Sequence, residues 1–278
     1  MKEVVVVQGL SFTYPNGVRA LDEVDLTVNE DTTSALIGQN GSGKTTLAKM
    51  MNGLLKPTKG KVLVEGVDTA DKYAYELARH VGYSFQNPTH QLYTDSVEAE
   101  LMAGPLNLGL TREQSAARAE EAAKMFGLEE VRKVRPSSLP FPLKKITGIA
   151  SVFAMKPKVM VLDEPTTGQD HVGLRMIQGA IKKLSAMAIT VVVITHDMRL
   201  VAESVDTVVA MALGKIVKVG TPEEIFLDSK TMEKAALRPP QILELSARLE
   251  SEIPDHGGPS ETVDEEVEKL QRIMSEHN

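Results

Sequence analysis

The sequence predicts an α/β protein built on a mostly parallel β-sheet with helices on both faces. Short apolar runs rich in β-branched residues alternate with helix-forming stretches along most of the chain. Runs that are apolar throughout are typical of parallel strands, which are buried on both faces. Because helical stretches separate these runs, we expect helices to cover both faces of the sheet.

The predicted elements follow one another in a regular order. Six apolar runs are predicted as strands, at residues 4–7, 33–37, 61–64, 81–85, 159–162 and 190–194. Three stretches are predicted as helices between them, at residues 44–54, 173–186 and 198–204. From about residue 88 to residue 155 helix formers replace the strand pattern, with segments at 98–102, 112–126 and 144–155.

This order predicts two parts. Residues 1–226 form the sheet domain, with a helical subdomain inserted at about 88–155. Residues 227–278 form a helical extension with an acidic tail. Of the formal net charge of −7, −6 comes from residues 251–278, which hold eight acidic and two basic side chains. This tail either pairs with a partner or solvates the chain.

The composition excludes several classes of protein. The chain has 278 residues, 42% of them hydrophobic and none of them cysteine, so we expect a large core without disulfides or thiolate metal sites. It has no apolar run of about 18 residues and no secretory signal pattern. We therefore expect a soluble cytosolic chain that reaches a membrane only through a partner. No basic stripe is present, so we expect no nucleic-acid partner.

A glycine-rich phosphate loop follows the strand at 33–37 and opens a helix. Residues 38–45 match the pattern G-x-x-x-x-G-K-[ST] in the structural context that this motif requires. Glycines let backbone N–H groups turn toward phosphate oxygens, Lys44 adds a charge at the β- and γ-phosphates, and Thr45 can bind Mg²⁺. The predicted ATP-binding residues of this segment are Gly38, Gln39, Asn40, Gly41, Ser42, Gly43, Lys44, Thr45 and Thr46.

Three further candidates follow apolar strands. Asp163 ends the strand at 159–162 and is predicted to hold Mg²⁺, while Glu164 beside it can accept a proton from attacking water. Adjacent acids are commonly a solvated turn, but beside a phosphate loop they indicate a hydrolytic site. His196 follows the strand at 190–194, at the edge where parallel sheets bind ligands. A lone histidine is more often structural, whereas this placement predicts a γ-phosphate contact.

These motifs, in this order, resemble the ATPase subunits of ABC transporters over about residues 4–226. The resemblance rests on the phosphate loop, on Asp163-Glu164-Pro165-Thr166 with Thr167-Gly168-Gln169-Asp170 beyond it, on His196, and on Phe85-Gln86. It implies a P-loop NTPase fold of ABC type, with antiparallel edge strands on the mostly parallel sheet. It also implies ATP and Mg²⁺ as cofactors and ATP hydrolysis coupled to transport.

The resemblance assigns two more residues. Tyr14 looks like the aromatic residue that stacks on adenine, the alternative being an ordinary strand-end aromatic. Gln86 looks like the residue that touches Mg²⁺ or the attacking water and hinges the insert against a membrane partner. Segments 85–92 and 237–242 are similar to the ATPases of energy-coupling-factor transporters, the vitamin and cobalt or nickel uptake systems.

The sequence departs from the family at one motif. The family's Leu-Ser-Gly-Gly-Gln signature donates N–H groups to the γ-phosphate of ATP held by the other subunit, but the matching stretch here is Leu139-Pro140-Phe141-Pro142-Leu143. The prolines have no N–H to donate, and Phe141 adds bulk where close approach is needed. A helix should still begin here, since proline suits a first turn. The site that this segment completes should be slow or inactive.

We therefore predict a heterodimer with a second ABC ATPase subunit. A homodimer would carry the defect in both composite sites, whereas in a heterodimer only the partner's ATP would face it. ATP bound to this chain would be hydrolysed against the partner's intact signature. Glu164 would act as the base, Gln86 and His196 would sense the γ-phosphate, and Thr45, Asp163 and Gln86 would hold Mg²⁺.

The predicted function is to power a membrane importer from the cytoplasmic face of the cell membrane. The resemblance implies a transmembrane coupling subunit and a substrate-binding membrane subunit as further partners. Two alternatives are the ATPase of another ABC importer class and a non-hydrolytic ATP-binding regulator, which the altered signature suggests. Intact Glu164 and His196 argue against the regulator. The transported substrate cannot be inferred from this chain.

Overall fold

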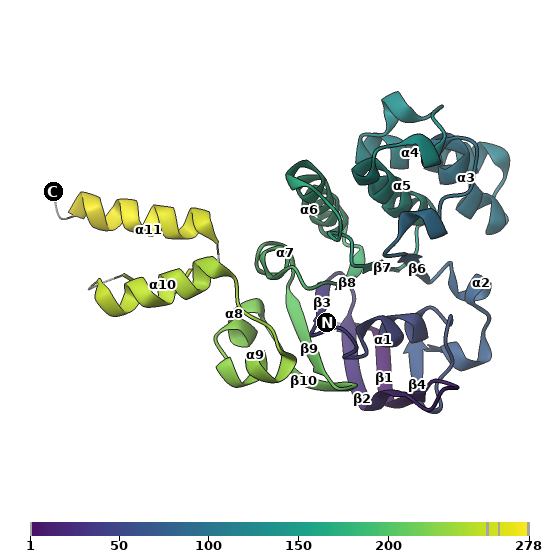
Figure 1. Cartoon of the computed structure of the whole chain (residues 1–278). Helices are drawn as coiled ribbons and strands as arrows, with labels where there is room; N and C mark the ends of the chain where they lie inside the picture. Colours follow the sequence, from purple (N-terminus) through teal and green to yellow (C-terminus); the bar gives the residue numbers. More distant parts are fainter. Residues whose placement is uncertain (1, 254–255, 261, 277–278) are drawn as a thin grey trace.

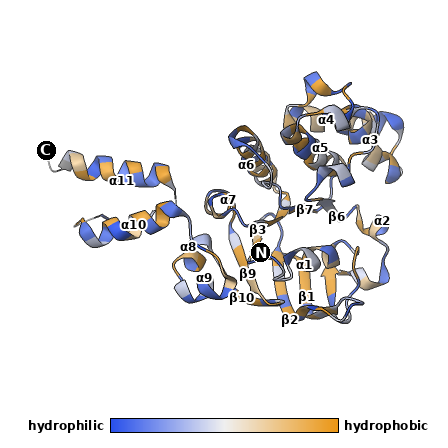
Figure 2. Cartoon of the chain, in the orientation of Figure 1, coloured by the Kyte–Doolittle hydropathy of each residue, from blue (hydrophilic) through white to orange (hydrophobic). Residues whose placement is uncertain are grey.

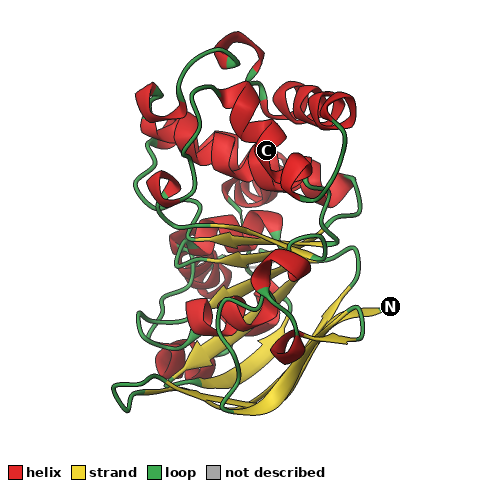
Figure 3. Cartoon of the chain, turned by 90° about the vertical axis from the view of Figure 1, so that its right-hand side faces the viewer, coloured by secondary structure: helices red, strands yellow, loops and turns green. Residues whose placement is uncertain are grey.

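The protein contains two β-sheets, a group of inserted helices, and two C-terminal helices that stand to one side (Figure 1). This computed structural model describes residues 2–253, 256–260 and 262–276. The strands are rich in hydrophobic residues, and hydrophobic residues also occur along the helices (Figure 2). Seen from the side, one group of helices lies above the strands and other helices lie among them (Figure 3). Two of the predicted tail residues, Asp255 and Glu261, lie outside the described residues.

A six-stranded sheet in the order β10-β9-β3-β8-β7-β6 forms the centre. Its members are β3 Thr33–Ile37, β6 Val81–Ser84, β7 Val159–Asp163, β8 Thr190–Ile194, β9 Thr207–Ala212 and β10 Lys215–Gly220. The pairs from β9 to β6 are parallel, and β10 pairs antiparallel with β9 at one edge. The mostly parallel sheet with an antiparallel edge strand is thus confirmed.

Side chains of this sheet alternate between two buried faces. In β7, Val159 and Val161 join one core cluster, while Met160 and Leu162 join the cluster on the opposite face. Because both faces are covered, the strand must be apolar throughout, which is the pattern that the sequence shows.

A second sheet is antiparallel, in the order β2-β1-β4-β5. Its members are β1 Glu3–Thr13, β2 Arg19–Asn29, β4 Lys59–Val64 and β5 Val67–Asp68. The runs at 4–7 and 61–64, which we expected in the parallel sheet, belong here instead. For β1 the short link to β2 is the reason, because it can join only antiparallel neighbours. Helix α1 (Lys44–Met51) packs Leu47 and Met50 into the cluster shared by both sheets.

The chain between β6 and β7 is helical. Its elements are the 3₁₀ turn Pro88–His90, α3 Val97–Asn107, α4 Arg112–Phe126, the 3₁₀ turns Glu129–Val131 and Pro136–Ser138, and α5 Phe141–Ala154. Side chains of Ser96 and Thr111 accept backbone N–H groups at the starts of α3 and α4. The rings of Phe126 and Phe153 meet edge to face at 5.4 Å and join α4 to α5.

The remaining helical elements flank the two sheets or follow them toward the C-terminus. They are the 3₁₀ turn Thr69–Asp71, α2 Ala74–Leu77, α6 His171–Ala186, α7 Met198–Ser204, α8 Pro222–Phe226, α9 Ser229–Ala235, α10 Gln241–Glu252 and α11 Val263–Glu276. Met232 and Ala235 of α9 pack in one cluster with Ile37 and Val208 of the large sheet. Helix α9 therefore supports the sheet, although it follows residue 226.

Helices α10 and α11 are joined by a buried polar group. The Ser246 hydroxyl donates to one oxygen of Glu266 at 2.6 Å, and His256 Nε2 lies 2.7 Å from the other. All three side chains are buried, so these bonds satisfy polar atoms that water cannot reach.

Candidate nucleotide-binding and hydrolysis site

The phosphate loop between β3 and α1 is shaped by two tightly enclosed glycines. Gly38 has a φ of 145° and Gly43 a φ of 102°, values that L side chains rarely adopt. A Cβ at Gly38 would lie 2.2 Å from the carbonyl oxygen of Met211, and one at Gly43 would lie 2.6 Å from that of Ala20. The loop backbone is therefore enclosed by both sheets, since Met211 belongs to β9 and Ala20 to β2.

Lys44 is buried at the start of α1. Its ammonium donates to the carbonyl oxygens of Gly38 at 2.7 Å and Gln39 at 2.9 Å. Burial lowers the pKa of Lys44, and the nearby carboxylates of Glu164 and Asp163 oppose this shift. When phosphates enter the loop, the ammonium group of Lys44 can donate to phosphate oxygens in place of these two carbonyl oxygens.

Thr45 and Asp163 converge at the edge of the sheet and fit a magnesium ion. The Thr45 hydroxyl donates to Asp163 Oδ1 at 3.3 Å, and the Tyr83 hydroxyl donates to Oδ2 at 2.6 Å. Burial raises the pKa of Asp163, and the hydrogen bonds from Tyr83 and Thr45 oppose the rise. Hydroxyl and carboxylate oxygens are ligands that Mg²⁺ prefers. Among the described residues no three His, Cys, Asp or Glu side chains gather to hold a metal ion, and Thr45 and Asp163 would supply two oxygen ligands.

Glu164 lies next to His196 at the mouth of the site. Its Oε2 is 2.8 Å from His196 Nδ1 and accepts the Thr167 hydroxyl at 3.2 Å. Its side chain is 10% exposed, whereas that of His196 is 60% exposed. The backbone of Glu164 has a φ of 46°, which is rare for a residue with a side chain. The contacts with His196 and Thr167 thus hold the Glu164 carboxylate in one orientation while part of it stays accessible to solvent.

The two residues assigned by resemblance have different surroundings. The Tyr14 hydroxyl lies 3.0 Å from Thr46 Oγ1, and its half-buried ring packs against Phe12 at 4.8 Å. This places the ring beside α1. Gln86 is exposed in the loop after β6, and within residues 2–253 no hydrogen bond or ion pair joins it to another predicted site residue.

The predicted residues otherwise form three groups. The structure pairs Thr45 with Asp163 and Glu164 with His196, and it places Lys44 within the phosphate loop. These residues come from the ends of β3, β7 and β8, which are neighbours in the large sheet. Their convergence follows from the parallel order of the strands.

Known proteins resemble this chain in sequence and in structure. Residues 21–167 match the ABC transporter family, just over half of the chain. The energy-coupling factor transporter ATP-binding protein EcfA1 of Caldanaerobacter subterraneus is 38% identical over 278 residues, covering 98% of this chain and 100% of that protein. The chain belongs to the ABC transporter family. It is an ATP-binding ATPase domain of that family, since its members hydrolyse ATP to drive transport.

Two further matches extend this comparison. An ABC transporter ATP-binding protein of the same organism is 40% identical over 246 residues, but this chain covers only 43% of its length. The solved structure of CbiO1 from Clostridium perfringens, described as part of the ABC transporter complex CbiONQ, has a TM-score of 0.76 and 32% identity. The match covers 89% of this chain and 100% of that one. None of the helices in the described ranges is long and apolar enough to cross a membrane.

The signature position of this ABC ATPase begins a helix, as predicted. Helix α5 starts at Phe141, with Pro140 at its N-cap and no side chain capping the first turn. Phe141 is 38% exposed, and its ring would lie 3.1 Å from a Cβ at Gly168. The aromatic ring therefore covers the loop that follows Glu164, at a position where the family presents small residues.

Three residues near this ABC site were missed by sequence reasoning. Tyr83 looks like an ordinary core aromatic of β6, and Lys145 looks like a solvated charge. Gln91 accepts the Phe85 N–H at 3.2 Å and donates to the Gly148 carbonyl at 2.8 Å, so it ties the end of β6 to α5. No local pattern distinguishes these residues, because their roles depend on contacts between distant segments.

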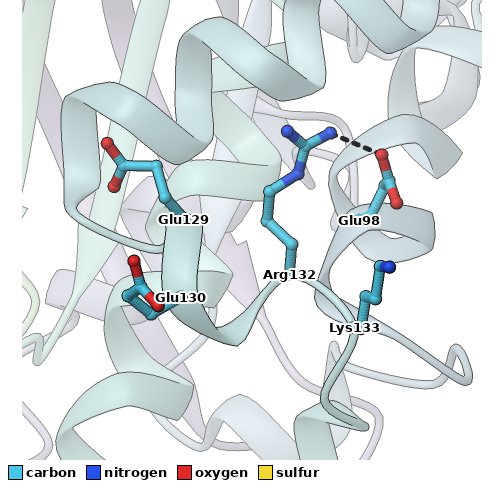
Figure 4. Close-up of a pocket in the computed structure, with 5 residues that line it drawn as sticks. All are labelled: Glu98, Glu129, Glu130, Arg132 and Lys133. Atoms are coloured by element: carbon cyan, nitrogen blue, oxygen red, sulfur yellow. Dashed lines mark hydrogen bonds and ion pairs between the residues drawn. The ribbon is translucent and has the colours of Figure 1, made fainter.

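Two surface hollows lie away from the nucleotide-binding residues. One, of about 410 Å³, is in the insert and is lined by Glu98, Glu129, Glu130, Arg132 and Lys133 (Figure 4). Arg132 pairs there with Glu98. The other, of about 1080 Å³, lies between α6 and α7 on one side and α10 and α11 on the other. None of the predicted site residues lines either hollow, so neither is the ATP site.

Replacing Tyr83 with phenylalanine should destabilise the protein by about 1–3 kcal/mol. The Asp163 carboxylate is buried, and losing the 2.6 Å hydrogen bond from the tyrosine would leave one of its oxygens without that donor. Urea unfolding followed by circular dichroism measures the change. Tyr73→Phe is the matched control, because Tyr73 is 69% exposed. Equal losses in the two variants would contradict the assigned bond.

Replacing Lys145 with methionine should make stability less dependent on pH. Burial lowers the pKa of Lys145 to about 8, against 10.5 in an exposed lysine. The unfolded chain therefore binds more protons between these values, and wild-type stability rises with pH through this window by up to about 3 kcal/mol. The methionine variant should be more stable than wild type at pH 7, and the difference should shrink toward pH 10.5. Parallel pH profiles of unfolding free energy would contradict this.

Proposed function

We propose that this chain is the ATP-hydrolysing subunit of an energy-coupling-factor type importer. The observation that carries the proposal is the contact between Glu164 and His196 at 2.8 Å, beside the Thr45–Asp163 pair. A base, a group that orients it, and a cation site lie together at the edge of one sheet. This is the arrangement that phosphoryl transfer to water requires.

The site residues support a simple division of work. Glu164 takes a proton from a water that attacks the γ-phosphorus, the bond to the bridging oxygen breaks, and ADP and phosphate leave. His196 orients the carboxylate of Glu164 and contacts the γ-phosphate. Lys44 and the loop N–H groups bind the charge of the phosphates, and Tyr14 stacks on adenine. Gln86 would join from the loop after β6 when the insert moves.

A magnesium ion would be held by Thr45 and Asp163. When bound, it supplies positive charge at the β- and γ-phosphates. Burial is the main reason why the pKa of Tyr83 lies well above its usual range, so its hydroxyl stays protonated. The hydroxyl can therefore donate to Asp163 and hold the carboxylate in one orientation.

The signature segment supports a heterodimer. Pro140 and Pro142 offer no N–H at the start of α5, and Phe141 stands over the adjacent loop. ATP facing this segment would lack the donors that its hydrolysis needs. ATP held by this chain would instead be hydrolysed against the intact signature of a different ATPase subunit.

The names of the relatives support a role with membrane partners. EcfA1 is named as an energy-coupling factor transporter protein, and CbiO1 is described as part of an ABC transporter complex. We place this chain at the cytoplasmic face of the cell membrane, beside a transmembrane coupling subunit and a substrate-binding membrane subunit. Residues 1–226, with the insert at about 88–155, would form the ATPase domain, and residues 227–278 an extension.

The altered signature also favours a second candidate, a non-hydrolytic ATP-binding regulator. A pull-down of the tagged chain from native membranes in mild detergent, with mass spectrometry of the co-purifying proteins, distinguishes the two. The importer predicts a second ATPase subunit with an intact signature and a polytopic protein. Recovery of the chain alone, or only with itself, would contradict the importer and favour the regulator.

A further inference from the structure

A lysine is buried beneath the hydrolysis site. Lys145 lies in the second turn of α5 and is 2% exposed, although it carries an ammonium group. Its Nζ donates to the backbone carbonyl oxygen of Glu164 at 2.9 Å. Burying a charged group is unfavourable unless its bonds compensate, and an apolar side chain would fill the same space at lower cost. Packing alone therefore does not explain this lysine.

The peptide that Lys145 binds has an unusual conformation. Glu164 adopts a φ of 46°, which residues with side chains rarely do, so neighbouring contacts must hold it there. Its N–H donates to the carbonyl of Ile194 at 2.9 Å, and its carbonyl also accepts the N–H of Thr167 at 3.3 Å. Together with Lys145, these bonds fix the backbone of Glu164 from β8, from its own loop and from α5.

We propose that Lys145 is a positioning residue that holds the backbone of Glu164 in the conformation that aims its carboxylate at His196 and the attacking water. This inference rests on the proposed role of Glu164 as the base. Lys145 contacts neither ATP nor the reacting atoms, so it acts only through Glu164. Losing its bond lets the strained peptide relax, and small displacements of a catalytic group lower rates steeply.

The position of Lys145 also connects the altered signature segment to the backbone of Glu164. Helix α5 begins at the altered signature, which in the proposed heterodimer would face the nucleotide held by the partner. Lys145 is one turn further along the same helix, and a single side chain joins it to the Glu164 backbone. A shift of α5 against the partner's nucleotide thus reaches the base of this chain's own site directly.

The test uses the complex recovered with its partner subunits and compares Lys145→Met with Lys145→Arg. Steady-state kcat, ATP affinity by calorimetry and Tm are measured for each. The expected result for Lys145→Met is a kcat at least tenfold lower, an ATP Kd within about twofold of wild type, and a Tm that is not lowered. Lys145→Arg keeps a cationic donor and should recover at least part of the lost rate. Lys124→Met, at an exposed lysine of the same insert, should change none of the three values.

The outcomes separate this inference from the proposed function. A Lys145→Met complex with wild-type kcat overturns the positioning role while the ATPase stands. A fall in kcat that comes with a lower Tm, or with no recovery in Lys145→Arg, assigns the lysine to structure and also overturns it. A wild-type complex without turnover would instead contradict the proposed function itself.

Discussion

Replacing Glu164 with glutamine should abolish ATP turnover and leave ATP binding almost unchanged. Glutamine keeps the shape of the side chain and an oxygen that can accept from His196 Nδ1, but it cannot take a proton from water. General bases contribute on the order of a hundred- to ten-thousandfold in rate. We expect a fall in kcat within that range and an ATP Kd within about twofold of wild type, measured by phosphate release and calorimetry.

The control for this variant is Glu129→Gln. Glu129 is an exposed acid of the insert that lines the hollow in Figure 4, so it tests the loss of one negative charge away from the site. It should retain full turnover. A Glu164→Gln enzyme that hydrolyses ATP at more than a tenth of the wild-type rate would remove Glu164 from its role as base.

Restoring a signature should activate the chain as a self-dimer. The combined variant Pro140→Ser, Phe141→Gly and Pro142→Gly returns N–H donors to the start of α5 and clears the ring from above Gly168. Removing one preorganised donor from a transition state costs about a hundredfold or more in rate. We therefore expect the turnover of the self-dimer to rise by about a hundredfold over that of wild type.

Two comparisons make this result specific. Adding Glu164→Gln to the restored signature should return turnover to background, because the gain depends on the same base. The restored chain must also keep a Tm close to wild type, since glycine in a first turn costs only about 1 kcal/mol per residue. A folded self-dimer with no gain in rate would mean that the altered signature is not what limits hydrolysis.

The sequence was most informative where one segment determines the structure by itself. The strand at 190–194 and the helices at 112–126 and 198–204 lie where the pattern predicted them. Strands β2 and β9 were missed for different reasons. In β2 apolar and polar residues alternate, because one face of the strand is buried and the other is more exposed. In β9 the alanines at 210 and 212 interrupt the run of β-branched residues. A search for continuous β-branched runs finds neither.

The predicted ends of two helices also differ from the observed ends by a few residues. The helix predicted at 44–54 stops at Met51, because Gly53 adopts a φ of 72° that ends the helical path. The helix predicted from 144 begins at Phe141 instead, since Pro142 sits comfortably in its first turn.

Only those site residues that belong to a local sequence pattern could be predicted. The phosphate loop, Asp163, Glu164 and His196 are recognisable because each follows an apolar strand or sits in a motif. The roles of Lys145 and Tyr83 cannot be predicted from the sequence, since each contacts a residue in a different segment of the chain. Contacts that join the insert to the sheet exist only once both have folded.

The order of strands in the large sheet bears on how the protein is made. Strand β3 leads into the phosphate loop and has β8 and β9 as its two neighbours, yet these begin only at Thr190 and Thr207. A ribosome adding roughly 5–20 residues per second emits them about ten to thirty seconds after β3. During synthesis the apolar β3 therefore waits without either neighbour until β8 and β9 have left the ribosome. No nascent fragment that stops short of β9 can assemble this sheet around its phosphate loop.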